Sequence, residues 1–575
     1  MSTSKYFDRI CVIVTVIALI ITTLFMFGEK LGIRKIVDED SEGYEAPSGF
    51  TDNDMNSDWD DTGATVITLN GDSAEISGDG AYQNGGNVVI ANAGKYVVSG
   101  TLSNGSIIVD AYDSSKVFIK LAGVSVYCGN DAAFRVNQAD KVFLTLAEGT
   151  DNAFESGSEY SESAISDNTG GTFFSHDDLT INGDGSLTIT ASYKHGIDCN
   201  DKLVIAGGNI TVNAPQDGIH ANDGVNIINA TLTINAADDG INGGESVLIA
   251  GGTINIPGCY EGIEAVTVEI RDGELSIECT DDGINANGGS GGFGGMGGNF
   301  RGGMQHSFGD DTDQNNGVQM RPDFGEEAGS DFGQKMQHGP KGGEDGAGFE
   351  PDAQPPEAIP QPDGNNNQPD SNNNMTANTD NSDTDEETWI HISGGNITIL
   401  NSSGRDSDGL DSNGDIIITG GNILISLTGS GGNNAIDYGS ESGGVCEISG
   451  GSVIACASSS MAEGFSQTSA QGSILYMFDE EVQSGTPVTV SDSDGNIILS
   501  WEVPCSYSAV TVSHPSMTSG NDYTITVGES SETITLDEIA TTYGEASQGG
   551  IGGMGRGGKN GIRDGNTDSI NESGE

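Results

Sequence analysis

Positive charge is what this sequence has least of. Among 575 residues, 21 lysines and arginines stand against 86 aspartates and glutamates, which gives a net charge of −65. Because phosphate backbones repel such a chain at any ordinary pH, we exclude nucleic-acid binding through a basic surface. Cations, and neutral or cation-bridged polymers, are the partners that this charge favours.

Two metal and redox motifs are missing as well. The sequence contains no Cys-x-x-Cys pair and no His-Glu-x-x-His motif, which excludes a zinc ribbon, a thioredoxin-type site and a zincin-type metalloprotease. Seven of the eight cysteines follow the N-terminal apolar segment at irregular spacing. We expect them to be small buried side chains, with pairing of Cys259 with Cys279, or of Cys446 with Cys456, as the alternative.

Long straight-chain helix formers are scarce, whereas the 88 glycines are about twice the usual share. A mainly helical fold is therefore not expected. Asn, Thr, Ile and Val dominate together with Gly, a composition typical of short strands joined by tight turns.

One long apolar segment is present, from Ile10 to Phe27. It is long enough to cross a bilayer as a helix, at about 1.5 Å per residue. No small-x-small cleavage site follows it, so we predict an uncleaved single-pass anchor within residues 1–35, with a cleaved signal peptide as the alternative. The flanking basic residues are balanced and do not set the orientation. We expect the protein at the cell membrane, with the bulk of the chain extracellular.

A repeat of about 22 residues follows the anchor. Within one unit, apolar residues alternate with polar ones over three short stretches, as at Leu203 and Ile205, Ile210 and Val212, and Ile219 and Ala221, which predicts three half-buried strands. Three strands per repeat, punctuated by glycine, predict an all-β fold: a right-handed parallel β-helix with about 22 residues per coil. The dipeptide Gly-Ile marks the repeat, at spacings of 22, 22, 22 and 21 residues and then in altered form, at Gly196, Gly218, Gly240, Gly262, Gly283, Gly409 and Ala435.

Composition divides the rest of the chain. We expect a flexible acidic stalk at residues 36–63, β-helix coils at 64–287 and 388–472, and a small C-terminal β cap at 473–546. The Gly-, Asn- and Pro-rich insertion at 288–387 and the tail at 547–575 carry too few apolar residues to offset chain entropy, so we predict disorder there.

Stacked coils would place equivalent residues in rows along one edge, pointing outward. The residues before each Gly-Ile or its variant are His195, Asp217, Asp239, Glu261, Asp282 and Asp408. The residues after the Ile or Leu are Asp198, His220, Asn242, Glu264, Asn285, Asp411 and Asp437.

Carboxylates about 5 Å apart repel unless something neutralises them, and few basic residues lie nearby in the sequence. Ca²⁺ binds six to eight oxygen ligands of this kind. We therefore predict calcium between coils, held by the ligand pool Asp217, Asp239, Glu261, Glu264, Asp282, Asp408 and Asp411. The alternative is that these aspartates are solvated turn formers, placed before glycines in left-handed backbone geometry.

A flat polar ridge with occasional aromatic residues would suit carbohydrate binding. The candidates are Asp198, His220, Asn242, Asn285, Tyr193, Tyr260, Asp437 and Tyr438. A lyase acting on acidic polysaccharide would instead need a basic side chain beside the calcium. Lys194, Arg271 and Arg405 are the basic residues near the rows; we interpret them as surface charges and assign no catalytic residue.

Several runs together make the sequence similar to the calcium-binding, carbohydrate-binding β-helix family of clostridia and related bacteria, whose fold resembles that of pectate lyases. The resemblance implies a membrane-tethered extracellular protein that binds cellulose-like or pectin-like polysaccharide, with structural calcium and no assigned catalysis. His195, His220 and Asn242 depart from it, because carboxylates would be expected there. The runs are Gly94-Lys-Tyr-Val-Val-Ser-Gly-Thr101, 139–150, 177–186, the Asp-Asp-Gly-Ile units at Asp238 and Asp281, and 249–256.

Three function classes remain open. We expect a monomeric carbohydrate-binding surface protein, because binding accounts for the polar rows as well as for the anchor. A calcium-dependent polysaccharide lyase and a structural adhesin without glycan affinity are the alternatives.

Overall fold

The computed structural model describes residues 46–546, apart from residue 113, residues 288–387 and residues 405–406. The described residues on both sides of the 288–387 gap belong to one compact unit. They are almost entirely β: one large, mostly parallel sheet holds 35 strands, and a second sheet holds four. The all-β prediction is thereby confirmed.

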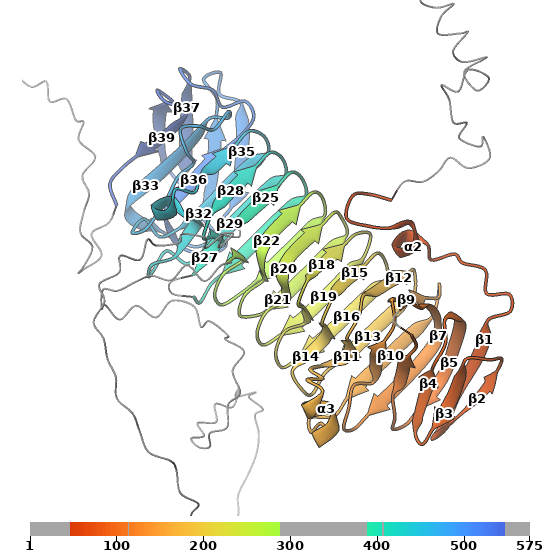
Figure 1. Cartoon of the computed structure of the whole chain (residues 1–575). Coiled ribbons are helices and arrows are strands. Elements are labelled where there is room, and N and C mark those ends of the chain that lie inside the picture. The colour runs from red at the N-terminus through yellow and green to blue at the C-terminus, as the bar shows by residue number, and fades with distance from the viewer. Residues whose placement is uncertain (1–45, 113, 288–387, 405–406, 547–575) are drawn as a thin grey trace, which may run out of the picture. The chain divides into compact units, whose positions relative to one another are not determined.

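The parallel strands lie in three ladders, in which each strand pairs with its equivalent in the next repeat (Figure 1). The first ladder consists of β4 (Asn87–Ile90), β6 (Ile107–Asp110), β8 (Phe134–Gln138), β11 (Gly171–Ser175), β14 (His195–Cys199), β17 (Ile219–Ala221), the first halves of β20 (Ile241–Ile249) and β22 (Ile263–Ile270), β24 (Ile284–Ala286), β27 (Asp408–Ser412) and β30 (Asn434–Tyr438).

The second ladder consists of the first halves of β5 (Gly94–Leu102) and β7 (Lys116–Cys128), then β9 (Lys141–Leu146), β12 (Leu179–Gly183), β15 (Lys202–Ile205), β18 (Gly224–Ile227), the second halves of β20 and β22, β25 (Trp389–Ile392), β28 (Asp415–Ile418) and β31 (Cys446–Ile448). The third consists of β1 (Thr65–Gly71), the second halves of β5 and β7, then β10 (Asp151–Ser156), β13 (Ser186–Thr190), β16 (Asn209–Ala214), β19 (Thr231–Ala236), β21 (Thr253–Gly258), β23 (Glu274–Glu278), β26 (Asn396–Asn401), β29 (Asn422–Leu427) and β32 (Ser452–Ala457).

The core runs between the ladders and is built from the inward residues of the alternating strands. In the first ladder, Ile197, Ile219, Ile241, Ile263, Ile284, Leu410 and Ile436 stand in register. All seven are at most 1% exposed and belong to one continuous apolar cluster. Because each repeat buries its apolar row against its neighbours, the Gly-Ile period marks the stacking directly.

The register continues across the 288–387 gap. Strand β22 pairs with β24 before the gap and with β25 after it, so that Ala265 stands opposite Ala286 and Thr267 opposite Trp389. The gap therefore opens within one repeat, between its first-ladder and second-ladder strands.

Antiparallel strands and short helices complete the structure. Strand β2 (Ser73–Ser77) pairs with β1, and β3 (Ala81–Asn84) pairs with β4. After β32 the chain adds β33 (Ser473–Val482), β36 (Tyr507–Ser513) and β39 (Ala540–Tyr543), and β36 lies antiparallel to β32. The second sheet contains β34 (Pro487–Ser491), β35 (Ile497–Glu502), β37 (Asp522–Val527) and β38 (Ser530–Thr535), and the helices are α2 (Asp52–Met55), α3 (Glu162–Ser166) and the 3₁₀ turn η1 (Ser440–Ser442).

Residues 46–63 differ from the flexible stalk that the sequence predicted. Phe50 packs on Val204, Ile228 and Leu248, the outward side chains of the second ladder, and Trp59 is 6% exposed. The signal lies in the second-ladder strands themselves, since β15 is buried at three consecutive positions instead of alternating. The rest of the predicted stalk, residues 36–45, lies outside the described residues.

Asp54 of α2 fixes this segment to the ladder. Its carboxylate pairs with Lys141 Nζ at 3.0 Å and accepts a hydrogen bond from the Thr180 hydroxyl at 2.5 Å. Burial acts to raise the pKa of Asp54, but the hydrogen bonds from Thr180, Thr51 and Lys141 lower it overall. The segment is therefore held by a buried, satisfied ion pair.

Replacing Asp54 by Ala should lower the free energy of unfolding by about 3 kcal/mol, because Lys141 would keep a buried charge without its closest partner. Urea unfolding measures the loss, and hydrogen exchange should show residues 46–63 exchanging faster. Asp52→Ala, at an exposed position of the same helix, is the matched control. Equal effects of the two variants would contradict the anchoring role.

The seven cysteines in the described part of the chain are all free and buried, as the sequence predicted. The alternative pairs Cys259 with Cys279 and Cys446 with Cys456 do not form. In the described ranges, no helix is long and apolar enough to span a membrane. The predicted anchor, insertion and tail, at 1–35, 288–387 and 547–575, lie outside those ranges.

Candidate functional site

The polar residues that follow each Ile or Leu line up across the first ladder. Pairing places them in consecutive register, in the order Asp198, His220, Asn242, Glu264, Asn285, Asp411 and Asp437. The residues that precede each glycine are linked in turn. The backbone N–H of Asp408 donates to Asp282 Oδ1 at 2.7 Å, and that of Asn434 donates to Asp408 Oδ1 at 2.8 Å.

The two rows are less exposed than expected. None of their residues is solvent-exposed, and Asp217, Asp239 and Asp282 are 5%, 7% and 9% exposed. The cause is mutual cover, since strands of successive repeats lie only about 4.8 Å apart. Asn242 Nδ2, for example, donates to Asp239 Oδ2 at 3.0 Å and to Glu264 Oε2 at 2.6 Å.

Burial makes the negative charge of these carboxyls costly. It raises the pKa of Glu261 to about 8 and that of Asp282 to about 9, with neighbouring carboxylates adding to both shifts. The pKa of Asp411 rises to about 7, and that of Asp239 is also raised, for the same two reasons. At neutral pH this row favours any bound cation that compensates its charge.

Their oxygen atoms cluster closely enough to share a cation. Four groups of carboxylates have ligand atoms within 4.8 Å of one another: Asp239 with Glu261 and Glu264, Glu261 with Asp281 and Asp282, Asp408 with Asp411 and Asp437, and Asp217 with Asp238 and Asp239. Beside the second group, Asn285 Nδ2 donates to Glu261 Oε2 at 3.0 Å, while its buried Oδ1 has no hydrogen-bond partner among the described residues. This orphaned oxygen and the surrounding carboxylates fit the donor set of a hard cation such as Ca²⁺.

Three members of these groups, Asp238, Asp281 and Asp437, were not assigned as ligands from the sequence. Asp238 and Asp281 are the first residues of Asp-Asp-Gly-Ile units, which was the available signal. Asp437 was interpreted as a sugar contact, but the structure groups it with Asp408 and Asp411.

The glycines between the two rows do not adopt left-handed geometry, which corrects the turn-former alternative. None of Gly196, Gly218, Gly240, Gly262, Gly283 and Gly409 has a positive φ. Glycine is required because there is no room for a side chain at these positions. A Cβ on Gly240, for example, would lie 2.6 Å from the carbonyl oxygen of Gly262 and 2.8 Å from Ile256 Cδ1. The last repeat has Ala435 in place of this glycine. In the preceding repeat, Ile425 of the third ladder lies against Gly409, and the residue in register with Ile425 in the last repeat is the smaller Ala455.

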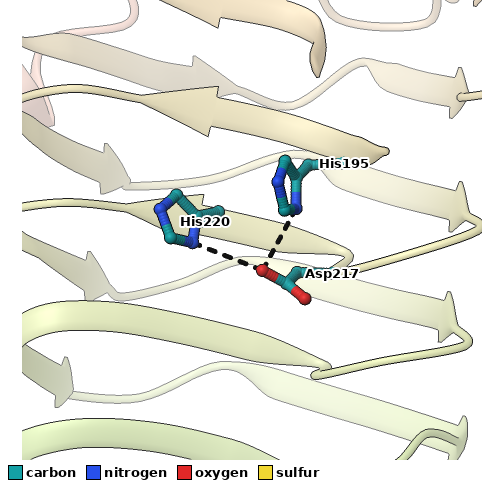
Figure 2. A group of neighbouring side chains, drawn as sticks. All are labelled: His195, Asp217 and His220. Atoms are coloured by element: carbon teal, nitrogen blue, oxygen red, sulfur yellow. Dashed lines mark ion pairs between the residues drawn. The ribbon is translucent and has the colours of Figure 1, made fainter. Parts of the chain in front are cut away.

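Asp217 lies in a different environment from the other carboxylates. Its Oδ2 is 3.1 Å from His195 Nδ1 and 3.3 Å from His220 Nδ1 (Figure 2). Burial acts to raise the pKa of Asp217, but the two histidines lower it overall. Burial acts to lower the pKa of His220, and its partners Asp217 and Asp198 raise it overall.

The three tyrosines that were candidates for sugar contacts lie in different environments. Tyr193 packs against Tyr160 with ring centroids 4.4 Å apart and ring planes inclined by 32°, and Tyr438 packs against the apolar core. Tyr260 is 47% exposed, and its hydrogen bond with Asp281 raises the pKa of its hydroxyl. Of the three tyrosine candidates, Tyr260 alone offers an exposed ring next to the row, and the carboxylate candidate Asp198 is buried.

The basic residues near the rows are engaged elsewhere. Arg271 forms two 2.8 Å contacts with the Glu269 carboxylate and donates to Ser48 O at 2.6 Å. Lys194 Nζ lies 5.6 Å from the centre of the Tyr193 ring. Arg405 lies outside the described residues. Neither described residue is placed as a free base beside the carboxylate groups.

The third ladder presents a polar face that the sequence analysis did not assign. Its strands alternate buried apolar residues with outward Ser, Thr, Asn and Glu, and every outward position is exposed or half-exposed. We call two in-register rows the polar face: Ser186, Asn209, Thr231, Thr253, Glu274 and Asn396, and Thr188, Thr211, Thr233, Asn255, Ser276 and Thr398. The polar halves of the period-2 pattern were the available signal.

Part of the chain matches proteins that are described as carbohydrate-binding. Residues 84–287 match the family model described as carbohydrate-binding domain-containing protein. A protein of Acetivibrio thermocellus with that description is 33% identical over 174 residues, which make up 30% of this chain and 58% of that protein. The chain thus spans less than two thirds of that relative's length.

One solved structure also matches. It is described as the polysaccharide lyase-like protein from C. thermocellum, in a gadolinium derivative, and is 29% identical with a TM-score of 0.33. The match covers 39% of this chain and 88% of that chain.

Proposed function

We propose that this protein binds polysaccharide outside the cell, on a right-handed parallel β-helix stabilised by calcium. The observation that carries the proposal is the polar face, which lies, apart from Asn396 and Thr398, within the residues that match carbohydrate-binding domain-containing proteins. Its hydroxyl and amide groups repeat about every 4.8 Å across the strands and about every 6.6 Å along them. Such an array can hydrogen-bond to successive hydroxyls of an extended cellulose-like or pectin-like chain.

The β-helix assignment rests on the three ladders. Each strand pairs with the equivalent strand of the next repeat, and the chain visits the ladders in a fixed order. Parallel crossover connections are right-handed in about 98% of cases, so we assign that hand.

Calcium fits the carboxylate groups better than a sugar does. Asp239, Glu261, Glu264, Asp282, Asp408 and Asp411 are buried or half-buried and lie against one another, so they offer a sugar little accessible surface. With Asp281 and Asp437 they would hold the ions. Bound calcium would neutralise the negative charge that these carboxylates bring together.

The remaining expectations concern the cellular setting. The apolar segment from Ile10 to Phe27 lies outside the described residues, and we propose it as the single-pass membrane anchor of a monomeric, extracellular protein. We propose no lyase activity, because Arg271 and Lys194 have other partners.

The full chain should migrate more slowly through native gels that contain polygalacturonate or hydroxyethylcellulose than through plain gels. Replacing Thr211 and Thr233 together by Glu should weaken that retardation at least about tenfold in apparent affinity, because two charges would displace hydroxyls at the centre of the polar face. Affinity electrophoresis over a range of polymer concentrations measures the change.

Thr524→Glu, on an outward position of the second sheet, is the matched control and should leave retardation unchanged. Equal weakening by both variants would move binding away from the polar face. No retardation on any polymer would favour the structural adhesin, and the release of unsaturated products would establish a lyase.

A further inference from the structure

Three side chains from successive repeats converge at one point of the first ladder (Figure 2). His195 begins β14, Asp217 lies in the turn before β17, and His220 lies within β17. The two imidazole rings are stacked, with centroids 5.0 Å apart and planes inclined by 24°. One ring nitrogen of each histidine and one oxygen of Asp217 all lie within 4.8 Å of one another.

The contacts within this cluster are close but leave the nitrogens unsatisfied. Both Nδ1 atoms are buried, and neither makes a hydrogen bond of ordinary geometry among the described residues; the one contact of each is the ion pair with Asp217 Oδ2, at 3.1 and 3.3 Å. Buried polar atoms without partners are rare in folded proteins and call for an explanation. A ligand located between the three atoms would provide one.

The second ring nitrogen of His220, Nε2, makes a hydrogen bond that sets the tautomer of the neutral ring. Its Nε2 is 3.3 Å from Asn222 Oδ1, and because an amide oxygen only accepts, Nε2 must donate. In the neutral ring, Nδ1 then carries the lone pair that a metal ion would bind, whereas in the protonated ring, which Asp217 favours, Nδ1 carries a proton and faces Asp217 Oδ2. Metal-binding histidines are oriented in this way, by a hydrogen bond from the second ring nitrogen.

The distances match those around a small tetrahedral ion. Ligands at about 2.0–2.1 Å from Zn²⁺ in tetrahedral geometry lie about 3.3 Å from one another. The two oxygen–nitrogen distances of 3.1 and 3.3 Å are of this size. Three protein ligands would leave the fourth position open to water or a ligand, and the side chains of His195 and His220 are 17% and 25% exposed.

The chemistry of the ladder changes at this point. The four carboxylate groups, one of which shares Asp217, contain oxygen donors alone, which suit calcium. Two imidazoles and a carboxylate suit borderline ions such as Zn²⁺. Asp217 divides its oxygens accordingly, because Oδ1 accepts the backbone N–H of Asp239 at 3.4 Å and Oδ2 faces the histidines.

We propose that His195, Asp217 and His220 form a binding site for a divalent transition-metal ion of the zinc class, which shares Asp217 with the neighbouring carboxylate group of Asp217, Asp238 and Asp239. The site occupies the position in the ladder where the other repeats carry carboxylates and amides. It does not depend on polysaccharide binding.

The test is a titration of the full chain with Zn²⁺ in saturating calcium, followed by isothermal calorimetry. One equivalent should bind. His220→Asn should weaken its affinity at least about 100-fold, and the double variant His195→Asp with His220→Asn should abolish binding. These replacements introduce the residue types of Asp239 and Asn242, which occupy the equivalent positions of the next repeats, so folding should persist and is checked by circular dichroism.

His391→Ala is the matched control, because His391 lies outside the cluster and beside Trp389. The affinity of this variant for Zn²⁺ should equal that of the wild type. With Co²⁺ in place of Zn²⁺, the wild type should show the intense visible absorption of a tetrahedral site, and the double variant should not. The proposal is overturned if the wild type takes up no equivalent of Zn²⁺, which would leave a proton as the cation in the cluster. Unchanged affinity in the folded double variant would overturn it equally.

Discussion

In calcium-free buffer, the free energy of unfolding should fall as the pH rises from about 4 to about 9. Burial raises the folded-state pKa of Glu261 to about 8 and that of Asp282 to about 9, whereas both types of carboxyl titrate near 4 when unfolded. Between those values the folded state binds more protons, so the stabilising contribution of these two carboxyls is complete below about pH 4 and is lost with rising pH. The loss approaches about 1.4 kcal/mol per pH unit for each raised carboxyl.

Calcium should reverse that loss. At a free concentration of 100 times the dissociation constant, one site adds about 2.7 kcal/mol to the free energy of unfolding. Melting curves of the full chain at pH 5 and pH 8, with EGTA or with calcium, measure both effects. Equal stability at the two pH values in EGTA, together with no gain from calcium at pH 8, would exclude a stabilising cation in this row.

The variant Glu261→Gln separates charge from structure. Without its buried charge the protein should be more stable than the wild type in EGTA at pH 8, and should gain less from calcium. Glu278→Gln, at an exposed position of β23, removes the same charge from the surface and should leave both quantities unchanged. A loss of stability in EGTA for Glu261→Gln would contradict the cost that we assign to its charge.

A single methyl group at Gly240 should destabilise the protein by about 3 kcal/mol. In Gly240→Ala the new carbon would lie 2.6 Å from the carbonyl oxygen of Gly262 and 2.8 Å from Ile256 Cδ1, and neither the backbone of the next repeat nor the packed isoleucine can withdraw freely. Chemical denaturation measures the change.

Two controls isolate the steric cause. Gly258→Ala adds the same methyl group where nothing lies within 4 Å, and should change the free energy of unfolding by well under 1 kcal/mol. Adding Ile256→Val to Gly240→Ala should recover part of the loss, because one of the two close contacts becomes smaller. If Gly258→Ala were as damaging as Gly240→Ala, lost backbone freedom would explain the effect better than lack of space.

The period of the sequence was enough to predict which residues stand next to one another. Parallel pairing of equivalent repeats follows from the alternation of Ile with polar residues, and it aligned Asp198, His220 and Asn242 correctly. The period could not predict how deeply those side chains lie. That depth depends on contacts with adjacent repeats, such as the hydrogen bond from Asn242 to Glu264, and so on three-dimensional packing.

Other features depended on contacts between distant parts of the chain. The acidic composition of residues 36–63 is typical of a flexible linker, yet Asp54 finds Lys141 and Thr180 more than 80 residues later. The histidines at 195 and 220 were recognised as departures from an all-carboxylate row. Their convergence on one oxygen of Asp217 depends on ring orientation, which spacing alone does not determine.

The antiparallel pairings at both ends have a consequence for association between molecules. A parallel ladder that simply stopped would present a row of unpaired backbone groups, and a second copy could extend it into a fibre. Here β2 and β3 pair with β1 and β4 at one end, and β36 pairs with β32 at the other. Near the second end, Ser466 and Ala470 donate their backbone N–H groups to the carbonyls of Cys446 and Ile448 in β31. The same hydrogen bonds that complete the fold therefore occupy the last strands of the second and third ladders, β31 and β32, where a second copy could otherwise pair.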